Sequence, residues 1–434
     1  MHRPDVQRTP ARGVSLRGRG FLIASTGCIR NCKQPFDTVT RFVDNRWPRL
    51  ASAIMFVFPV SPRELFSERK QQFVGWGIPR VMIERVEQRV TDNWHDGPGG
   101  WAYEWSREAA VARDGMRWLL ASMLYGAARF PVACTPLRQA ALHNQTECFV
   151  RASGDFPVRF ERVEIDHDRG SVRFPVHVYA PKPRGDYPVV CLTGGVDTGK
   201  MELHRLALAL AIYGRFTVVV MDMPGTGETN TALRSDSHHV YRTVLSGFAG
   251  RRKKAIVGVS FGGHWAAKLA LLGEVDAAID WGGPIGAAER DAGLVSRLPN
   301  GMTGIIANAA RLPGLPDIDS TKRLLQTFSL KEQGLLDRPD CAPLLAVNGD
   351  CDPYIPRDDV QVFGAYPSAR VWLLRGLGHC AAEASIRVVP GMLAWLRAVL
   401  HGQSLRNRVV LRAAEWILPA RVQHCNDESG TDSV

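Results

Sequence analysis

The sequence predicts an α/β fold in which helices cover both faces of a mostly parallel sheet, with a block of helices in front of it. From about residue 187 onward, short apolar runs alternate with segments of helical period. Such alternation requires crossover connections between parallel strands. In residues 65–150, by contrast, apolar residues recur at helical spacing.

The helical block is expected at residues 55–155. Apolar positions around 78–86 have helical spacing, and 136–150 predicts another helix. Ser106 is interpreted as the N-cap of a helix that runs to about Gly126. A Gly-rich loop with several aromatic residues is expected from Trp94 to Trp105.

The second domain is expected at residues 156–402. Alternating segments at 160–165 and 172–179 predict half-buried antiparallel strands. Further strands are predicted at 187–193, 216–222, 254–259, 277–283, 343–349 and 369–374, and helices at 201–213, 261–272 and 386–401. The stretch 285–340 is longer than one crossover and predicts a helical insertion. Residues 403–434 are expected to form a C-terminal helix and a polar tail.

The positive charge is concentrated at the N-terminus. The chain of 434 residues has a net charge of +11, and residues 1–54 hold ten Lys and Arg against three Asp, which is +7 of that total. The rest is near neutral and gives no electrostatic argument for nucleic acid. Residues 1–54 are interpreted as a disordered basic extension, an Arg-rich targeting segment, or sequence upstream of a start at Met55, and we favour the last.

Apolar runs and cysteines limit the class further. The longest apolar runs have about eight residues, and a membrane helix needs about 18. The nine cysteines are scattered, with no CxxC pair and no zinc spacing. We therefore expect reduced thiols in the cytoplasm, no metal and no cofactor.

Gly258-Val259-Ser260-Phe261-Gly262 is the strongest local signal. It follows an apolar strand and opens a helix, which is the context of a nucleophile elbow. The small residues at both ends permit the strained turn that projects Ser260 from the edge of the sheet. Ser260 is therefore the predicted nucleophile.

A serine nucleophile needs a base and an orienting acid. Asp352 and His379 each follow a predicted strand, and the chain order Ser, Asp, His is that of the α/β-hydrolases. Asp350 is an alternative candidate for the acid. The pattern G-x-x-D-x-x-x-P, from Gly349 to Pro356, places the aspartate at Asp352 and therefore favours Asp352. The predicted triad is Ser260–Asp352–His379.

Two backbone amides are expected to stabilise the developing oxyanion. One is the N–H of Phe261, directly after the nucleophile. The other comes from the Thr193–Asp197 loop, from Val196 or Gly195.

A nucleotide-binding alternative arises from the same loop. Residues 194–200 fit G-x-x-x-x-G-K, and the strand ending at Asp222 resembles one that holds Mg²⁺. Met201 stands where a phosphate-binding loop has a Ser or Thr. The P-loop interpretation is therefore a remote alternative.

With these motifs, residues from about 65 to 401 resemble the FrsA-like (fermentation–respiration switch) esterase group, on the helical block and the Gly-Gly-x-Asp loop. The resemblance implies a Ser260–Asp352–His379 triad under a helical cap. Its members include serine esterases and hydrolases of carbon–carbon bonds, such as those of pseudooxynicotine degradation and polyketide shortening.

Four further residues are candidates for contact with the substrate. Asp197 and Lys200 lie close to the oxyanion loop in sequence, and Trp101 and Trp105 belong to an aromatic stripe that would suit an apolar substrate or else form core.

The predicted function is a serine hydrolase that cleaves an ester or related acyl bond of a small, largely apolar substrate through an acyl-enzyme. The alternatives are a carbon–carbon bond hydrolase and a thioesterase or cyclase acting on a polyketide or aromatic ketone. The expected partner is an acyl or ketone small molecule, with neither nucleic acid nor membrane, and a homodimer is left open.

Overall fold

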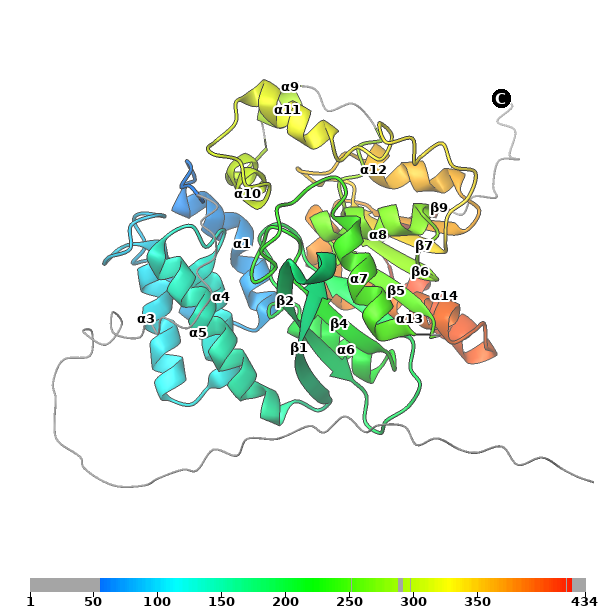
Figure 1. Ribbon diagram of the computed structural model, residues 1–434, viewed down its shortest axis with the longest axis horizontal. Coiled ribbons are helices and arrows are strands. Elements are labelled where there is room, and N and C mark those ends of the chain that lie inside the picture. The colour runs from blue at the N-terminus through cyan, green and yellow to red at the C-terminus, as the bar shows by residue number, and fades with distance from the viewer. Residues whose placement is uncertain (1–54, 251, 288–291, 297, 419, 424–434) are drawn as a thin grey trace, which may run out of the picture. The chain divides into compact units, whose positions relative to one another are not determined.

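The computed structural model describes residues 55–250, 252–287, 292–296, 298–418 and 420–423. The predictions for residues 1–54 and for the polar tail at 424–434 lie outside this range. The described chain is built around a nine-stranded sheet in the order β1-β2-β4-β3-β5-β6-β7-β8-β9 (Figure 1). Its strands are β1 Arg159–His167, β2 Val172–Ala180, β3 Val189–Thr193, β4 Thr217–Met221, β5 Lys254–Val259, β6 Ala277–Trp281, β7 Leu344–Gly349, β8 Ala369–Leu374 and β9 Ala420–Gln423.

Strands β4, β3, β5, β6, β7 and β8 pair in parallel, and β1, β2 and β9 add antiparallel pairs at the two ends. This confirms the predicted mostly parallel sheet. The strand β9 is absent from the sequence prediction, because four residues without an apolar run give no periodic signal.

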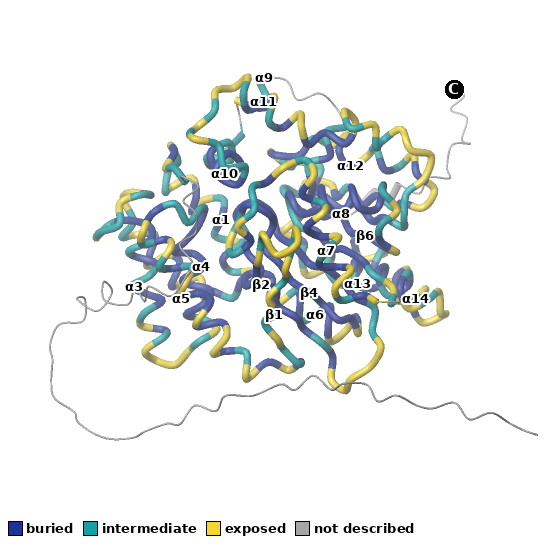
Figure 2. The backbone as a smooth tube through the Cα atoms, viewed as in Figure 1, coloured by how far each residue is buried: buried dark blue, intermediate teal, exposed yellow. Residues whose placement is uncertain are grey.

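Helices cover both faces of the sheet, as predicted. In β3, Val190 and Leu192 join a core with α6 (His204–Ile212) and α13 (Ser385–Leu400). Val189 and Cys191 face the opposite core, with α7 (His238–Ala249) and α8 (Phe261–Leu271). Every residue of α8 is buried, which suits a helix that lies between the sheet and other elements (Figure 2).

Five helices precede the sheet: α1 Pro62–Trp76, α2 Arg80–Glu87, α3 Trp101–Asp114, α4 Trp118–Arg129 and α5 Pro136–Ala152. The side chain of Ser61 accepts a hydrogen bond from Glu64 N–H at the start of α1, and Thr135 caps α5 in the same way. A core of large aromatic rings joins α1, α3 and the end of α4, formed by Phe66, Phe73, Trp101, Trp105 and Phe130.

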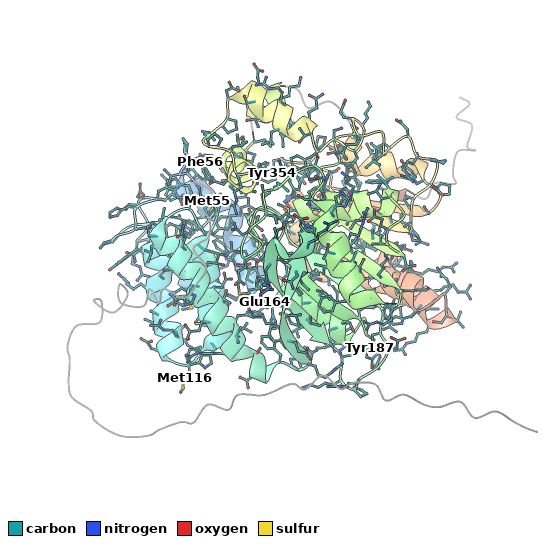
Figure 3. The ribbon with its side chains drawn as sticks, in the orientation of Figure 1. Met55, Phe56, Met116, Glu164, Tyr187 and Tyr354 are labelled. Carbon is teal, nitrogen blue, oxygen red and sulfur yellow. The ribbon has the colours of Figure 1, made fainter. Side chains whose placement is uncertain are left out.

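The prediction of one helix from Ser106 to Gly126 is wrong. Two helices, α3 and α4, occupy this region, and Met116 between them has φ 55° (Figure 3). Gly100, not Ser106, is the N-cap of α3, so Trp101 and Trp105 lie on a helix and not on a loop. Apolar residues recur at helical spacing on both sides of residues 115–117, so the sequence pattern does not reveal that the helix ends there.

The stretch between β6 and β7 contains α9 Ala292–Ser296, α10 Met302–Ala309 and α11 Ile318–Gln326, in the region predicted as a helical insertion. The side chain of Asn308, on α10, makes two hydrogen bonds to the backbone of Phe56: its Oδ1 accepts from Phe56 N–H at 2.9 Å and its Nδ2 donates to Phe56 O at 3.0 Å. The segment before α1 is thereby attached to the insertion.

The remaining elements are short or C-terminal: α12 Asp358–Gln361, α14 Leu405–Trp416, and 3-10 turns at Ser153–Asp155, Asp168–Gly170, Val362–Ala365 and His379–Ala384. Among the described residues, no helix combines the length and the apolar character needed to cross a membrane.

Candidate active site

Ser260 lies at a strained turn between β5 and α8. Its backbone has φ 55° and ψ −131°, an unfavourable conformation for a residue with a side chain. A Cβ on Gly258 would overlap the carbonyl of Gly262, and one on Gly262 would lie 2.6 Å from the oxygen of Gly194. The two flanking glycines are therefore required by the close packing of the turn, as the sequence motif predicts.

His379 lies between the serine and an aspartate. Its Nε2 is 2.9 Å from Ser260 Oγ, and its Nδ1 is 2.6 Å from Asp352 Oδ2. Asp352 also accepts a hydrogen bond from the Tyr354 backbone at 2.8 Å and from Asn348 Nδ2 at 2.8 Å, which fix its carboxylate. The structure thus brings together all three residues of the predicted triad.

The competing aspartate takes no part in this arrangement. Asp350 Oδ1 accepts from Gly376 N–H at 2.6 Å, and its Oδ2 lies 3.6 Å from Arg357. Asp350 therefore holds the adjoining turns together, and of the two aspartates it is Asp352 that contacts the histidine.

The electrostatics of the pair favour a charged imidazolium beside a carboxylate. Burial by itself lowers the pKa of His379, but Cys380 and Asp352 raise it well above the usual value. Burial raises the pKa of Asp352, and the histidine more than reverses this, so that pKa lies below its usual range. Asp352 therefore remains ionised at neutral pH and can stabilise a proton on His379.

The loop 194–200, called the oxyanion loop below, lies alongside the serine. A Cβ added to Gly195 would lie 2.9 Å from Ser260 Oγ and 3.3 Å from Phe261 N. Within the described part of the chain, the amides of Phe261 and Val196 donate to no protein acceptor. These amides are thus available for a substrate oxygen.

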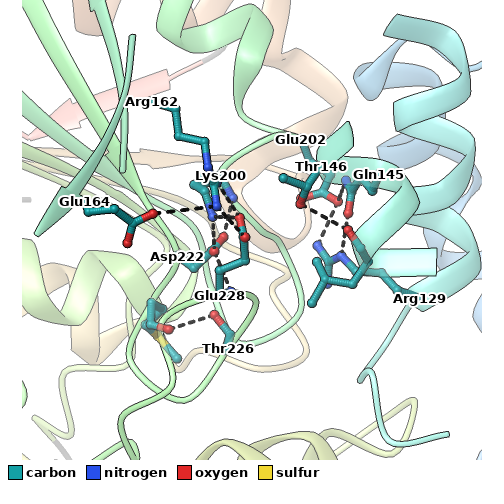
Figure 4. Close-up of polar contacts among 12 residues, drawn as sticks. Arg129, Gln145, Thr146, Arg162, Glu164, Lys200, Glu202, Asp222, Thr226 and Glu228 are labelled. Carbon is teal, nitrogen blue, oxygen red and sulfur yellow. Dashed lines mark hydrogen bonds and ion pairs between the residues drawn. The ribbon is translucent and has the colours of Figure 1, made fainter. Parts of the chain in front are cut away.

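Lys200 is not available to a substrate. It has no exposed surface, and its Nζ lies 2.6 Å from Asp222 Oδ2 and 2.7 Å from Glu228 Oε2 (Figure 4). Burial lowers the pKa of Lys200, but the two carboxylates raise it above the usual value. This corrects both the prediction of a substrate contact and the P-loop alternative, because the ammonium that would bind a phosphate is already neutralised.

A second buried ion cluster anchors the chain just after this loop. Glu202 Oε1 accepts from Arg129 Nη2 of α4 at 2.7 Å and from Gln145 Nε2 of α5 at 2.7 Å (Figure 4). Since all three side chains are nearly or fully buried, the end of the oxyanion loop is fixed to the helical block.

The remaining substrate candidates separate into two cases. Asp197 stays at the site, 6% exposed, with its Oδ2 3.2 Å from Arg69 Nη2. Trp101 and Trp105 are fully buried in the core of the helical block, where Trp101 Nε1 donates to Ala127 O. The two tryptophans therefore serve packing and not contact with a substrate, which corrects their prediction.

Sequence analysis missed Arg69, Glu68 and Tyr354, which lie beside the triad. The ring of Tyr354 packs edge-on against that of His379, with centroids 5.1 Å apart, and its hydroxyl contacts Glu68 and Arg69. Tyr354 could have been predicted to lie near the site, because it is only two residues from the predicted acid, Asp352. Nothing in the local sequence indicated Glu68 or Arg69, which reach the site through tertiary packing.

Among the described residues, no group of three or more His, Cys, Asp or Glu side chains is arranged to hold a metal ion. The six cysteines of this range are free thiols.

Comparison with known proteins agrees with the resemblance to the FrsA-like esterases noted in the sequence. Residues 78–371 match the family described as Esterase FrsA-like. Two relatives, each named Esterase FrsA, from Salmonella typhi and Salmonella newport, are 25% identical over 344 residues, covering 73% of this chain and 80% of theirs.

Two solved structures show the same fold. AbyA5 superposes with a TM-score of 0.66 at 21% identity, over 77% of this chain and 93% of its own. A 2,6-dihydroxy-pseudo-oxynicotine hydrolase has a TM-score of 0.58 at 19% identity, over 76% of this chain and 95% of its own.

Proposed function

The chain belongs to the FrsA-like esterase family and is a hydrolase of the α/β-hydrolase fold, and from this premise we propose that it cleaves an ester or related acyl bond of a small, largely apolar substrate through Ser260. The observation that carries the proposal is the continuous hydrogen-bonded line from Ser260 Oγ through His379 to Asp352. This line provides the base that a serine hydroxyl needs to act as a nucleophile.

In the proposed mechanism His379 Nε2 accepts the hydroxyl proton as Ser260 Oγ attacks the substrate carbonyl. The N–H groups of Phe261 and Val196 donate to the resulting oxyanion, while Asp352 stabilises the imidazolium. His379 then protonates the leaving group, which departs and leaves an acyl-enzyme. A water molecule, deprotonated by the same histidine, attacks the acyl carbon. The bond from the acyl carbon to Ser260 Oγ then breaks, His379 returns the proton to Oγ, and the acid product leaves.

A second candidate is the hydrolysis of a carbon–carbon bond next to a ketone. The likeness in fold to the 2,6-dihydroxy-pseudo-oxynicotine hydrolase is the observation that favours it. The triad would attack the ketone in the same way, and the proton from His379 would go to the departing carbon.

The test is a profile of p-nitrophenyl esters and acyl thioesters of increasing chain length, with Ser260→Ala as control. We expect turnover by the wild type and a loss of about 10³-fold or more in the variant. Activity near background on every ester and thioester, together with labelling of Ser260 by a fluorophosphonate, would favour carbon–carbon cleavage. Undiminished turnover by Ser260→Ala would overturn the role of the serine.

A further inference from the structure

One buried arginine of the helical block touches both loops that build the candidate site. Arg69, on α1, has a side chain that is 8% exposed. Its Nη2 lies 3.2 Å from Asp197 Oδ2 and 3.4 Å from the hydroxyl of Tyr354. No other side chain described above joins these two loops.

Each partner of Arg69 is tied to a different half of the site. Asp197 belongs to the oxyanion loop, two residues after Gly195, which packs against Ser260. Tyr354 belongs to the loop at residues 350–356, called the acid loop here. Its backbone N–H fixes Asp352 Oδ1 at 2.8 Å and its ring packs against His379.

Neighbouring residues of α1 strengthen the same two links. Gln72, one turn after Glu68, donates from Nε2 to Thr198 Oγ1 of the oxyanion loop at 3.0 Å and accepts from Arg69 Nη1 at 3.2 Å. Glu68 accepts from the hydroxyl of Tyr354. The three side chains thus form one polar face of α1 directed at the site.

The charge on Arg69 is maintained by this environment. Burial lowers the pKa of the guanidinium, but Asp197, Tyr354 and Glu68 raise it above its usual value. The guanidinium brings Nη2 to Asp197 and Tyr354 and Nη1 to Gln72, and the single ammonium of a lysine covers such separated partners less well.

We propose that Arg69 is a positioning residue that holds the oxyanion loop at a fixed place relative to His379, so that the helical block controls the geometry of catalysis. The catalytic half of this inference rests on the proposed function. Because a misplacement of about 1 Å can reduce a rate about 100-fold, loss of Arg69 should impair the chemical step and not merely the stability of the fold.

The experiment compares Arg69→Met and Arg69→Lys with a matched control, Arg138→Met. Arg138 is likewise a buried arginine of the helical block, but its Nε and Nη2 donate to the carbonyl oxygens of Phe130 and Asn93, inside that block. Two quantities are measured on each full-length protein: the rate of labelling of Ser260 by a fluorophosphonate, and amide hydrogen exchange in segments 194–202 and 350–356.

We expect Arg69→Met to label about 10- to 100-fold more slowly than the wild type and to exchange faster in both segments. Arg69→Lys should retain part of both properties, because one ammonium can still reach one partner. In Arg138→Met, labelling of the folded protein and exchange in the two segments should match the wild type.

The outcomes separate the two proposals. If the wild type labels and Arg69→Met labels equally fast with unchanged exchange, the role of Arg69 is overturned and the proposed function stands. If the wild type does not label but Arg69→Met exchanges faster in both segments, the proposed function fails and the structural link stands. Equal effects of Arg138→Met and Arg69→Met would also overturn the role of Arg69.

Discussion

Gly195 lies directly against Ser260: a methyl group in place of its hydrogen would lie 2.8 Å from the serine Cβ and 2.9 Å from Oγ. Real Cβ atoms do not approach other heavy atoms so closely, so a larger residue here must displace the oxyanion loop or the nucleophile. Gly195 therefore lines the space beside Ser260 Oγ in which the substrate carbonyl would bind.

Gly195→Ala is expected to lower the rate of ester hydrolysis at least about 100-fold, because the loop and the serine can no longer keep their spacing. The measurement is kcat/KM on the best p-nitrophenyl ester, with folding checked by circular dichroism. Gly154→Ala is the matched control, since a Cβ at Gly154 meets nothing within 4 Å. A Gly195→Ala enzyme as active as the control would contradict this geometry.

The pH dependence of activity should report the pair of His379 and Asp352. His379 must be neutral to accept a proton, so kcat/KM should fall as the pH drops through its pKa. That pKa is raised, so the acidic limb of the profile should lie above the ordinary histidine value of 6.5.

Asp352→Asn removes the charge that stabilises the imidazolium. The acidic limb should therefore move to lower pH, while the plateau of kcat falls by about 10⁴-fold. In Asp350→Asn, the amide oxygen can still accept from Gly376 N–H, so we expect an unchanged limb and nearly unchanged activity. A shift of the limb in Asp350→Asn alone would contradict the assignment of the acid.

Lys200→Met should destabilise the protein by about 3–5 kcal/mol, because it leaves the buried carboxylates of Asp222 and Glu228 without their shared cation. Urea denaturation measures the change in the free energy of unfolding. The control is Lys70→Met, whose ion pair with Glu87 at 2.6 Å is more than a third exposed and should contribute about 0–1 kcal/mol. Similar losses in both variants would argue against the buried network.

The buried carboxyl group of Asp280 should make the stability of the protein depend on pH. Asp280 lies on β6, opposite Gly258 of the nucleophile turn. Burial raises the pKa of this carboxyl to about 8, although a hydrogen bond from Gly283 N–H opposes the shift. The folded chain therefore binds a proton that the unfolded chain releases near the usual aspartate pKa of 3.8, so stability should fall as the pH rises from about 4 to about 8.

Asp280→Asn can keep the hydrogen bond from Gly283 and cannot ionise. The variant should match the wild type near pH 4 and exceed it increasingly toward pH 8, as measured by thermal unfolding across that range. A difference in Tm that does not grow with pH would show that Asp280 is ionised in the folded protein.

Most of the fold could be predicted from the sequence, because its signals are local. Uninterrupted apolar runs marked the parallel strands. Alternation located β1 and β2, but the expected half-burial of β2 is wrong, because six successive residues, 174–179, are buried between β1 and β4 in the sheet and the cores on its two faces. Local signals failed where a boundary depends on backbone conformation, as at Met116, or where a strand exists only by pairing, as for β9.

The sequence by itself predicted the class of the protein and the three side chains that the structure joins by hydrogen bonds, because Ser260 lies at a sharp turn between a strand and a helix and Asp352 and His379 each follow a strand. Only the tertiary structure decided which polar residues surround them. It placed Lys200 in an internal ion cluster, buried Trp101 and Trp105, and brought Arg69 to the site from more than a hundred residues away. The burial and ion pairing of these particular side chains depend on segments distant in the chain, so the sequence around them could not decide between a place in the core and a place at the site.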